Sequence, residues 1–305
     1  MSIWVCGEVL IDLIPDSAGK VQAIVGGGPA NTAKALAKLG AGVEFIDGIS
    51  LDDYGKSARS ELEQAGVGLS LSYASNKPTC TAKVSIAANG SATYDFAIDG
   101  TATFDFAHSW LPSAQQLKPS LLHIGTLVTA IEPAAGILHE WALGVADFAP
   151  IVFDPNIRSA VISDRDLYVA AVEKWVAIST VVKLSDEDAH WLYPDISPIA
   201  LAQRWISEGV ALVVITQGEA GIIGVTSDEV VEVPARKTTV IDTVGAGDTV
   251  GAVLVEAIVE SGVLAISGEK LKSLLDRAAV AAAITCSRSG AQPPTAAEIS
   301  TAMAG

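Results

Sequence analysis

The fold is indicated most directly by the stretch Asp242-Thr243-Val244-Gly245-Ala246-Gly247-Asp248-Thr249. Residues 238–241 before it are of β-type, and residues 250–259 after it form an apolar run of helical length. A glycine turn that opens a helix leaves backbone N–H groups unpaired at the positive end of the helix dipole, which makes an anion site. Asp248 stands inside this site. A carboxylate beside a bound anion fits a transfer reaction, in which a nearby hydroxyl must lose its proton.

The composition is that of a folded protein with a large core. The chain has 305 residues, of which 50% are hydrophobic and 18% are charged, and this length suits one large α/β domain or two smaller ones. The net charge is −16 and no run of Lys and Arg occurs, so we expect no nucleic-acid partner. Because the overall field repels anions, an anionic substrate must be held by local N–H groups or a metal.

The cysteines and the N-terminal segment bear on the cellular compartment. Cys6, Cys80 and Cys286 are widely spaced, so they fit neither a disulfide framework nor a metal cluster and are interpreted as buried small residues. The first apolar run lacks a preceding basic segment and is interrupted by Asp12, which indicates a strand and not a signal peptide. No uncharged apolar stretch of about 18 residues occurs. We therefore expect a cytoplasmic protein without a membrane partner.

Strand-like and helix-like runs alternate along most of the chain. The expected strands cover residues 3–6, 43–46, 121–124, 151–153, 181–183 and 212–216, and the expected helices cover residues 30–39, 56–65, 133–146, 199–208 and 277–286. Gly40 and Gly66 follow two of these helices as stop signals. Such alternation predicts an α/β fold with a doubly wound, mostly parallel sheet flanked by helices.

One region breaks the alternation. Residues 81–88 and 92–98 flank Asn89-Gly90, which is a strong hairpin signal. A hairpin inserted in an α/β chain is expected to stand off the main sheet. We therefore expect an α/β core domain with the nucleotide and catalytic site, from residues 1–12, 26–70 and 104–305, and a small β-sheet lid from residues 13–25 and 71–103. The free edge of such a lid is a surface for a homodimer.

A second glycine-rich stretch is Gly26-Gly27-Gly28-Pro29-Ala30-Asn31. Its glycines permit close backbone approach, and Asn31 offers a donor and an acceptor at the start of a helix, which suits recognition of hydroxyl groups. A tight turn with Asn31 as a cap explains the same residues equally well.

Two other glycine patterns resemble known nucleotide-binding motifs but lack residues that those motifs require. Gly55-Lys56-Ser57 ends like a P-loop, but Ser50 stands where the motif needs glycine. Gly245-x-Gly247 resembles part of a dinucleotide fingerprint, but Val250 occupies the third glycine position. A P-loop and a nicotinamide site are both disfavoured.

Polar residues also follow two expected strands, where ligand sites of α/β folds gather. Asp154-Pro155-Asn156-Ile157-Arg158 places an acid, an amide and a guanidinium together, although a turn with a structural ion pair is an equal alternative. Two glycines occur in Thr216-Gln217-Gly218-Glu219-Ala220-Gly221. They either make room for a bound nucleotide or form a tight turn. The four histidines, His108, His123, His139 and His190, show no metal-ligand spacing and are interpreted as structural.

The two glycine-rich stretches, in this order, resemble the two signatures of the ribokinase-like (PfkB) carbohydrate kinases. The resemblance covers nearly the whole chain. Within the family, Gly7-Glu8-Val9-Leu10-Ile11-Asp12 and Phe153-Asp154-Pro155-Asn156-Ile157-Arg158 look most like bacterial fructokinases, and 2-keto-3-deoxygluconate kinases share some of these residues. The resemblance implies a doubly wound sheet with a β lid over the sugar.

The resemblance also implies roles for individual residues. Asp248 corresponds to the catalytic base, with Gly245, Ala246 and Gly247 as the anion hole. Sugar-binding positions are Asp12, Gly27, Gly28, Asn31, Asp154, Asn156 and Arg158. Nucleotide-binding positions are Thr216, Gly218, Gly221, Lys183, Gly245 and Gly247. ATP and Mg²⁺ are the implied cofactors, and Asp242 and Thr243 resemble a monovalent-cation loop that would take K⁺.

One motif departs from the family. An Asn-x-x-Glu that helps to organise magnesium and phosphate is replaced here by Ser185-Asp186-Glu187-Asp188. Asp188 is still expected as a magnesium ligand, because aspartate in place of glutamate shortens the acid but keeps its oxygen chemistry.

Together these features predict ATP-dependent phosphorylation of a primary hydroxyl, with fructose converted to fructose 6-phosphate. The alternatives are 2-keto-3-deoxygluconate or another sugar or nucleoside as the acceptor. A non-catalytic sugar sensor on the same fold is disfavoured, because Asp248 and its glycines are intact.

Overall fold

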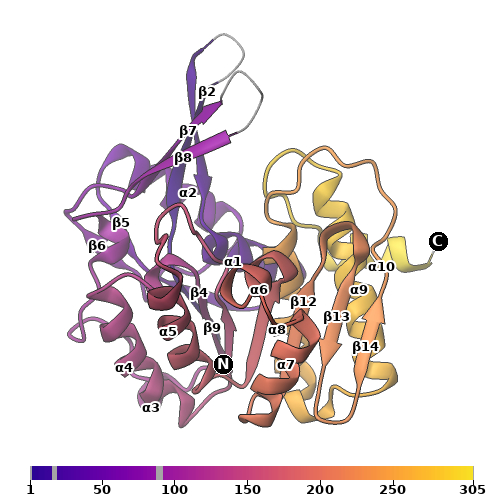
Figure 1. Cartoon of the computed structure of the whole chain (residues 1–305). Helices are drawn as coiled ribbons and strands as arrows, with labels where there is room; N and C mark the ends of the chain where they lie inside the picture. The colour runs from indigo at the N-terminus through magenta and orange to yellow at the C-terminus, as the bar shows by residue number, and fades with distance from the viewer. Residues whose placement is uncertain (1, 16–18, 87–91, 305) are drawn as a thin grey trace.

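The structure, a computed structural model, describes residues 2–15, 19–86 and 92–304. An eight-stranded sheet lies between two layers of helices, and strands β2, β7 and β8 of a smaller sheet project from it (Figure 1). This confirms the predicted α/β class.

The large sheet has the strand order β14-β13-β12-β11-β10-β9-β1-β4. Six strands are parallel, namely β1 (Ile3–Cys6), β4 (Val43–Ile46), β9 (Leu121–Gly125), β10 (Ile151–Asp154), β11 (Val181–Ser185) and β12 (Leu212–Thr216). The antiparallel strands β13 (Ile222–Val225) and β14 (Val230–Val233) complete one edge. The strands that the sequence predicted at these places are confirmed.

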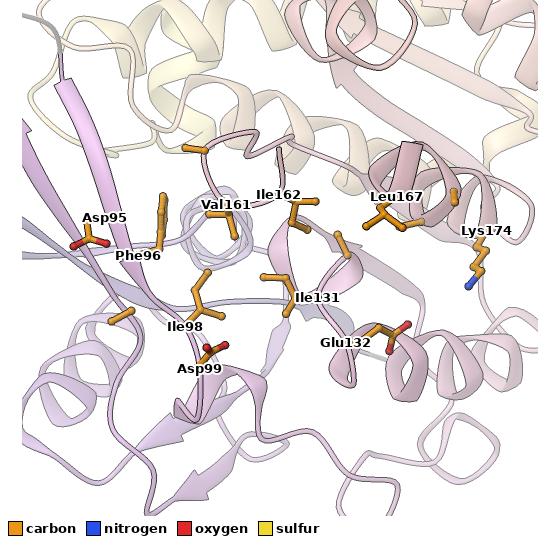
Figure 2. Close-up of a pocket in the computed structure, with 15 residues that line it drawn as sticks. Asp95, Phe96, Ile98, Asp99, Ile131, Glu132, Val161, Ile162, Leu167 and Lys174 are labelled. Atoms are coloured by element: carbon orange, nitrogen blue, oxygen red, sulfur yellow. The ribbon is translucent and has the colours of Figure 1, made fainter. Parts of the chain in front are cut away.

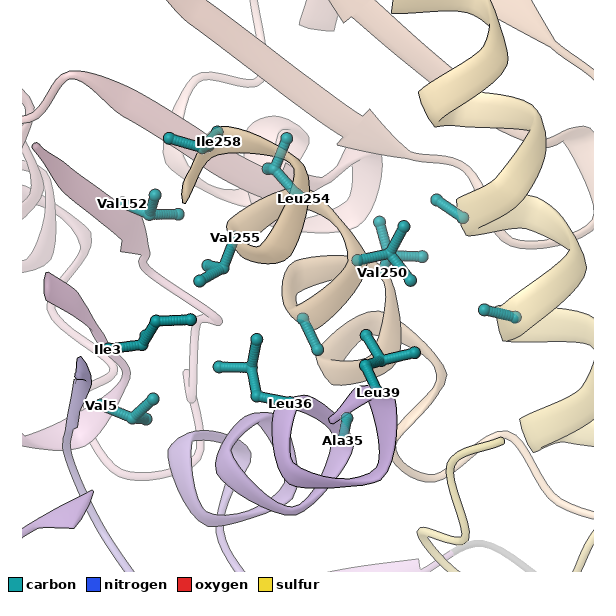
Figure 3. Packing of buried hydrophobic residues seen from close by; sticks show 14 of the residues in the cluster. Ile3, Val5, Ala35, Leu36, Leu39, Val152, Val250, Leu254, Val255 and Ile258 are labelled. Carbon is teal, nitrogen blue, oxygen red and sulfur yellow. The ribbon is translucent and has the colours of Figure 1, made fainter. Parts of the chain in front are cut away.

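Each face of this sheet carries its own hydrophobic core, as expected when parallel strands are buried on both sides. One core contains side chains from α1 (Gly28–Leu39), α2 (Asp53–Gln64), α8 (Ala246–Ser261), α9 (Glu269–Cys286) and α10 (Ala296–Ala304). Figure 3 shows Leu36 of α1 and Val255 of α8 pointing toward Ile3 of β1. The other core contains side chains from α3 (Ala114–Leu117), α4 (Ala134–Ala146), α5 (Arg165–Val176), α6 (Asp186–Leu192) and α7 (Pro198–Ser207).

The smaller sheet has the order β3-β2-β7-β8. Its strands are β2 (Leu10–Pro15), β3 (Val21–Gly26), β7 (Thr81–Ile86) and β8 (Ala92–Ala97). The expected Asn89-Gly90 turn lies outside the described residues. Because Leu10 pairs with Gly26, this sheet includes Asp12 and Gly26, which the sequence-based boundaries assigned to the core. Strands β5 (Gly48–Ser50) and β6 (Tyr73–Ser75) form a separate parallel pair.

The β-type run before the glycine turn is not a strand. Residues 238–241 are irregular, and Val240 and Ile241 are 60% and 64% exposed. The prediction was wrong because β propensity needs a pairing partner, and the strand at this edge of the sheet ends at Val233. Throughout the described residues, each helix is too short or too polar to cross a bilayer.

Candidate active site

The site lies where the order of the large sheet reverses. From β1 the chain passes to β4 on one side and later to β9 on the other, so the carboxyl ends of β1 and β9 form a topological switch point. Ligands of open α/β sheets bind at such a point. Glu8 follows β1, Thr126 follows β9, and Asp154 ends β10 at the same edge.

The N-terminus of α8 supplies backbone donors. Gly245 caps the helix with φ 79°, and a side chain there would collide with Ala291. Ala246 and Thr249 donate their N–H groups to Thr243 and Gly245, whereas those of Gly247 and Asp248 have no partner among the described residues. This is the expected anion cradle.

The Asp248 carboxyl group is buried beside these donors. Asn31 Nδ2 donates to Asp248 Oδ2 at 2.9 Å, which joins the first turns of α1 and α8. Burial raises the pKa of Asp248 to about 6, because the Lys183 charge and the Asn31 hydrogen bond only partly offset the loss of water. Asn31 Oδ1 is buried without a partner, so it is an acceptor available to a ligand hydroxyl.

The glycines before α1 allow polar groups to approach the backbone. A side chain at Gly28 would lie 2.8 Å from Asn156 Nδ2 and 3.3 Å from Asp248 Oδ1, and one at Gly26 would collide with the Asp12 carboxylate. The structure therefore brings Asp12, Asn156 and Asp248 around one glycine turn.

A buried ion pair lies below the cradle. Lys183 Nζ is 2.8 Å from Asp154 Oδ2, and both side chains are at least 95% buried. Burial disfavours the charged amine, but the charges of Asp154 and Asp248 outweigh it and raise the pKa of Lys183. A side chain at Gly247 would lie 3.1 Å from Nζ, so the ammonium group lies against the first turn of α8.

Arg158 supplies the second positive charge. Its Nη1 donates to Asn156 Oδ1 at 2.7 Å. Its charge lowers the pKa values of Glu8, Asp12 and Asp248, so these three carboxyl groups face one guanidinium. For Asp12 burial is the larger effect, and its pKa is raised overall.

A family model described as pfkB family carbohydrate kinase matches residues 2–298. The chain belongs to this family. Its relatives include a fructokinase of Rhizobium leguminosarum bv. trifolii, 35% identical over 82% of this chain and 77% of the relative, and one of Salmonella typhimurium, 28% identical over 85% of each.

Solved PfkB structures share the fold over nearly the whole chain. Fructokinase with bound ATP from Xylella fastidiosa has a TM-score of 0.92 at 22% identity, covering 99% of this chain and 98% of that one. A fructokinase from Vibrio cholerae O395 in its fructose-, ADP- and calcium-bound form has a TM-score of 0.87 at 24% identity, covering 98% of each chain. At these identities the likeness establishes the fold, and the predicted family is confirmed.

Asp188 has a role in this PfkB chain that the sequence did not predict. Ser185 Oγ accepts from the Asp188 N–H, and the Asp188 carboxylate accepts from the Ser185 N–H, which forms a capping box for α6. The other Asp188 oxygen accepts from the Ile157 N–H at 3.0 Å. Both carboxylate oxygens therefore accept hydrogen bonds from backbone N–H groups. In this way Asp188 positions the loop that carries Asn156 and Arg158.

Asp154 is another candidate ligand for a metal ion. No group of three or more His, Cys, Asp or Glu residues able to hold a metal occurs in the described ranges. Mg²⁺ in nucleotide sites needs only one or two carboxylates besides phosphate oxygens. Asp154 Oδ1 is buried without a partner and fits this donor type. The Asp242 carboxylate accepts from the Val244 and Gly290 N–H groups, so it shapes the turn before α8.

The expected nucleotide loop begins at the same sheet edge. Thr216 pairs in register with Ser185, and Gln217 N–H donates to Gly221 O. Gly218 and Gly221 have φ values of 53° and 123°, so this is a tight glycine turn. The structure therefore places the loop beside the end of β11, two residues beyond Lys183.

The smaller sheet presents one face to the core. In register, Asp12 lies beside Ala82 and Ala82 beside Phe96, so these three share a face, while Asp95 alternates to the other. A cavity of about 820 Å³ lies between the β8 edge and the core. Figure 2 shows Phe96 and Ile98 opposite Val161 and Ile162 in this cavity. This cavity is therefore lined mainly by apolar side chains, with charged residues among them.

Proposed function

We propose that the protein transfers the γ-phosphoryl group of ATP to a primary hydroxyl of fructose and forms fructose 6-phosphate. The carrying observation is the buried Asp248 carboxylate, held by Asn31 and placed beside the unpaired N–H groups of α8. Membership of the pfkB carbohydrate kinase family supports the reaction type. The names of the relatives, which are fructokinases at 26% to 35% identity, support fructose as the acceptor.

The residues divide the reaction between proton transfer and charge stabilisation. Asp248 accepts the proton of the attacking hydroxyl, while the N–H groups of Gly247 and Asp248 and the Lys183 ammonium stabilise charge on the transferring phosphoryl group. Asn31 Oδ1 and Asp12 accept hydrogen bonds from sugar hydroxyls. When bound, Mg²⁺ neutralises phosphate charge, and Asp154 is the carboxylate that would hold it.

A panel of acceptors tests this function. ADP formation is measured in a coupled assay with fructose, 2-keto-3-deoxygluconate, ribose and nucleosides. We expect fructose to give the highest kcat/KM. A higher kcat/KM with 2-keto-3-deoxygluconate would assign the enzyme to that substrate, and sugar binding without any ADP formation would indicate a sensor.

Asp12→Ala should weaken sugar binding. Loss of a charged acceptor for a buried hydroxyl costs about 1.5–3 kcal/mol, so the fructose KM should rise roughly 10-fold to 100-fold with little change in the ATP KM. Steady-state kinetics measure both constants. Asp228→Ala is the matched control, because Asp228 is an exposed aspartate in the turn between β13 and β14, at the opposite ends of the strands. An unchanged fructose KM in Asp12→Ala would remove Asp12 from the sugar site.

The pH dependence should report Asp248. A base must be unprotonated, and burial raises its pKa to about 6, so kcat/KM for fructose should fall about tenfold per unit below pH 6. Initial rates at constant ionic strength between pH 4.5 and pH 8 measure this limb. A profile that stays flat down to pH 4.5 would contradict the assignment.

A further inference from the structure

Glu8 is a buried acid that the proposed mechanism does not use. It follows β1 at the switch point and is 2% exposed. Its carboxylate accepts a hydrogen bond from Thr126 Oγ1 across 118 residues of sequence. Burial raises the pKa of Glu8 to about 7, while this hydrogen bond and the Arg158 charge act in the opposite direction. Because burial of an acid costs free energy, we expect Glu8 to have a role in the site around it.

Thr126 has an unusual backbone conformation. Its φ is 63° and its ψ is −148°, which is strained for a β-branched residue, and strain of this kind costs about 1–3 kcal/mol. Four hydrogen bonds hold it. Its N–H donates to Asp154 O at 3.0 Å, its carbonyl accepts from Thr129 N–H at 3.1 Å and from Thr129 Oγ1 at 2.6 Å, and Glu8 accepts its hydroxyl.

The strained residue lies against the proposed catalytic group. A side chain at Gly28 would lie 3.2 Å from Thr126 Cγ2, 2.8 Å from Asn156 Nδ2 and 3.3 Å from Asp248 Oδ1. The Thr126 methyl group, the Asn156 amide and the Asp248 carboxylate thus border one point on α1. A shift of Thr126 would change the packing around Asp248.

We propose that Glu8 is a positioning residue for phosphoryl transfer, which fixes Thr126 against Gly28 and thereby fixes the surroundings of the Asp248 carboxylate. This inference rests on the function proposed above. Glu8 does not touch the substrate in this arrangement, and its hydrogen bond to Thr126 carries the effect. A fold-change in kcat, with little change in either KM, is therefore the expected signature.

Charged and titratable groups surround Glu8 from several elements. They are Cys6 on β1, Asp47 after β4, Cys80 before β7, Arg158 after β10, Tyr168 on α5 and Asp248 on α8. Asp248 raises the pKa of Glu8, and by reciprocity an ionised Glu8 raises the pKa of Asp248. Because burial raises the pKa of Glu8 to about 7, Glu8 is mostly neutral near pH 6, where Asp248 titrates, so the neutral amide of Glu8→Gln should leave the acid limb of kcat/KM nearly unchanged.

The test compares Glu8→Ala, Glu8→Gln and Thr126→Val. We expect Glu8→Ala and Thr126→Val each to lower kcat about 10-fold or more, with both KM values within twofold of wild type. Glu8→Gln keeps an acceptor for the Thr126 hydroxyl and should retain kcat within about threefold. The double variant Glu8→Ala/Thr126→Val should be no slower than the worse single variant, because both changes remove one interaction.

Ser179→Ala is the control for loss of a buried hydroxyl, since Ser179 Oγ donates to Trp175 O at the opposite end of the strands. It should leave kcat unchanged. Wild-type kcat in Glu8→Ala or Thr126→Val, or multiplicative losses in the double variant, would overturn the proposal.

A second measurement does not depend on the substrate. Because the pKa of folded Glu8 is raised to about 7, the folded protein binds more protons than the unfolded one between about pH 4.5 and pH 7, and its contribution to stability falls as pH rises through this window. The urea midpoint of wild type should therefore fall relative to that of Glu8→Gln between pH 5 and pH 8. A constant difference would overturn the Glu8 inference, whereas a wild type inactive on every sugar would overturn the proposed function.

Discussion

Asp248→Asn should lower kcat for fructose phosphorylation by a factor of roughly 10² to 10⁴, the usual effect of removing a general base. Asparagine has nearly the same shape and can still contact Asn31, so the first turns of α1 and α8 should stay together. Fructose and ATP should bind with nearly unchanged affinity. Steady-state kinetics give kcat, and titration of tryptophan fluorescence gives both dissociation constants.

The variant should also be more stable than wild type at neutral pH. Burial of the Asp248 charge raises its pKa to about 6, so the ionised group disfavours the folded state above that pH, and the neutral amide removes this effect. Asp53→Asn on the exposed start of α2 is the control for loss of a negative charge. Near-wild-type kcat in Asp248→Asn would eliminate Asp248 as the base.

Much of the fold was predictable because the parallel strands are buried on both faces. Apolar runs then mark them without ambiguity, and β1, β4 and β12 have the bounds expected from the sequence. The β-type residues 238–241 misled the prediction because strand formation depends on a neighbouring strand, which a local pattern does not reveal. The bounds of the smaller sheet shifted for the same reason, since pairing of Leu10 with Gly26 extends it.

The candidate site was predictable where one residue type does one task. Gly245 and Gly28 indicate places where other groups approach the backbone closely, and Asp248 is conspicuous as an acid in an anion site. Ser185-x-x-Asp188 fits two tasks, a magnesium motif with replacements and a capping box. The structure shows the capping box, and the magnesium role of Asp188 stays a prediction. Glu8 was missed because its partner Thr126 is distant in sequence, although its place after the first strand is a signal of the same kind as that of Asp154.

The second large effect is expected from Lys183→Met. This change leaves the carboxylate of Asp154 buried without its partner, and breaking a buried pair in this way costs about 3–5 kcal/mol of unfolding free energy. It also removes a positive charge beside the first turn of α8, so kcat should fall by a factor of roughly 10² to 10³. Urea unfolding and steady-state kinetics measure the two losses separately.

A compensated variant separates stability from catalysis. Lys183→Met/Asp154→Leu replaces the whole ion pair by apolar side chains, which is often neutral for stability, so most of the lost unfolding free energy should return. Its kcat should remain low, because the Lys183 charge that faces the phosphoryl group and the Asp154 carboxylate, the candidate magnesium ligand, are then both absent. The Lys183 charge lowers the pKa of Asp248, so the acid limb of kcat/KM should also move to higher pH in Lys183→Met. Recovery of kcat together with stability in the compensated variant would mean that the Lys183–Asp154 pair only supports the fold.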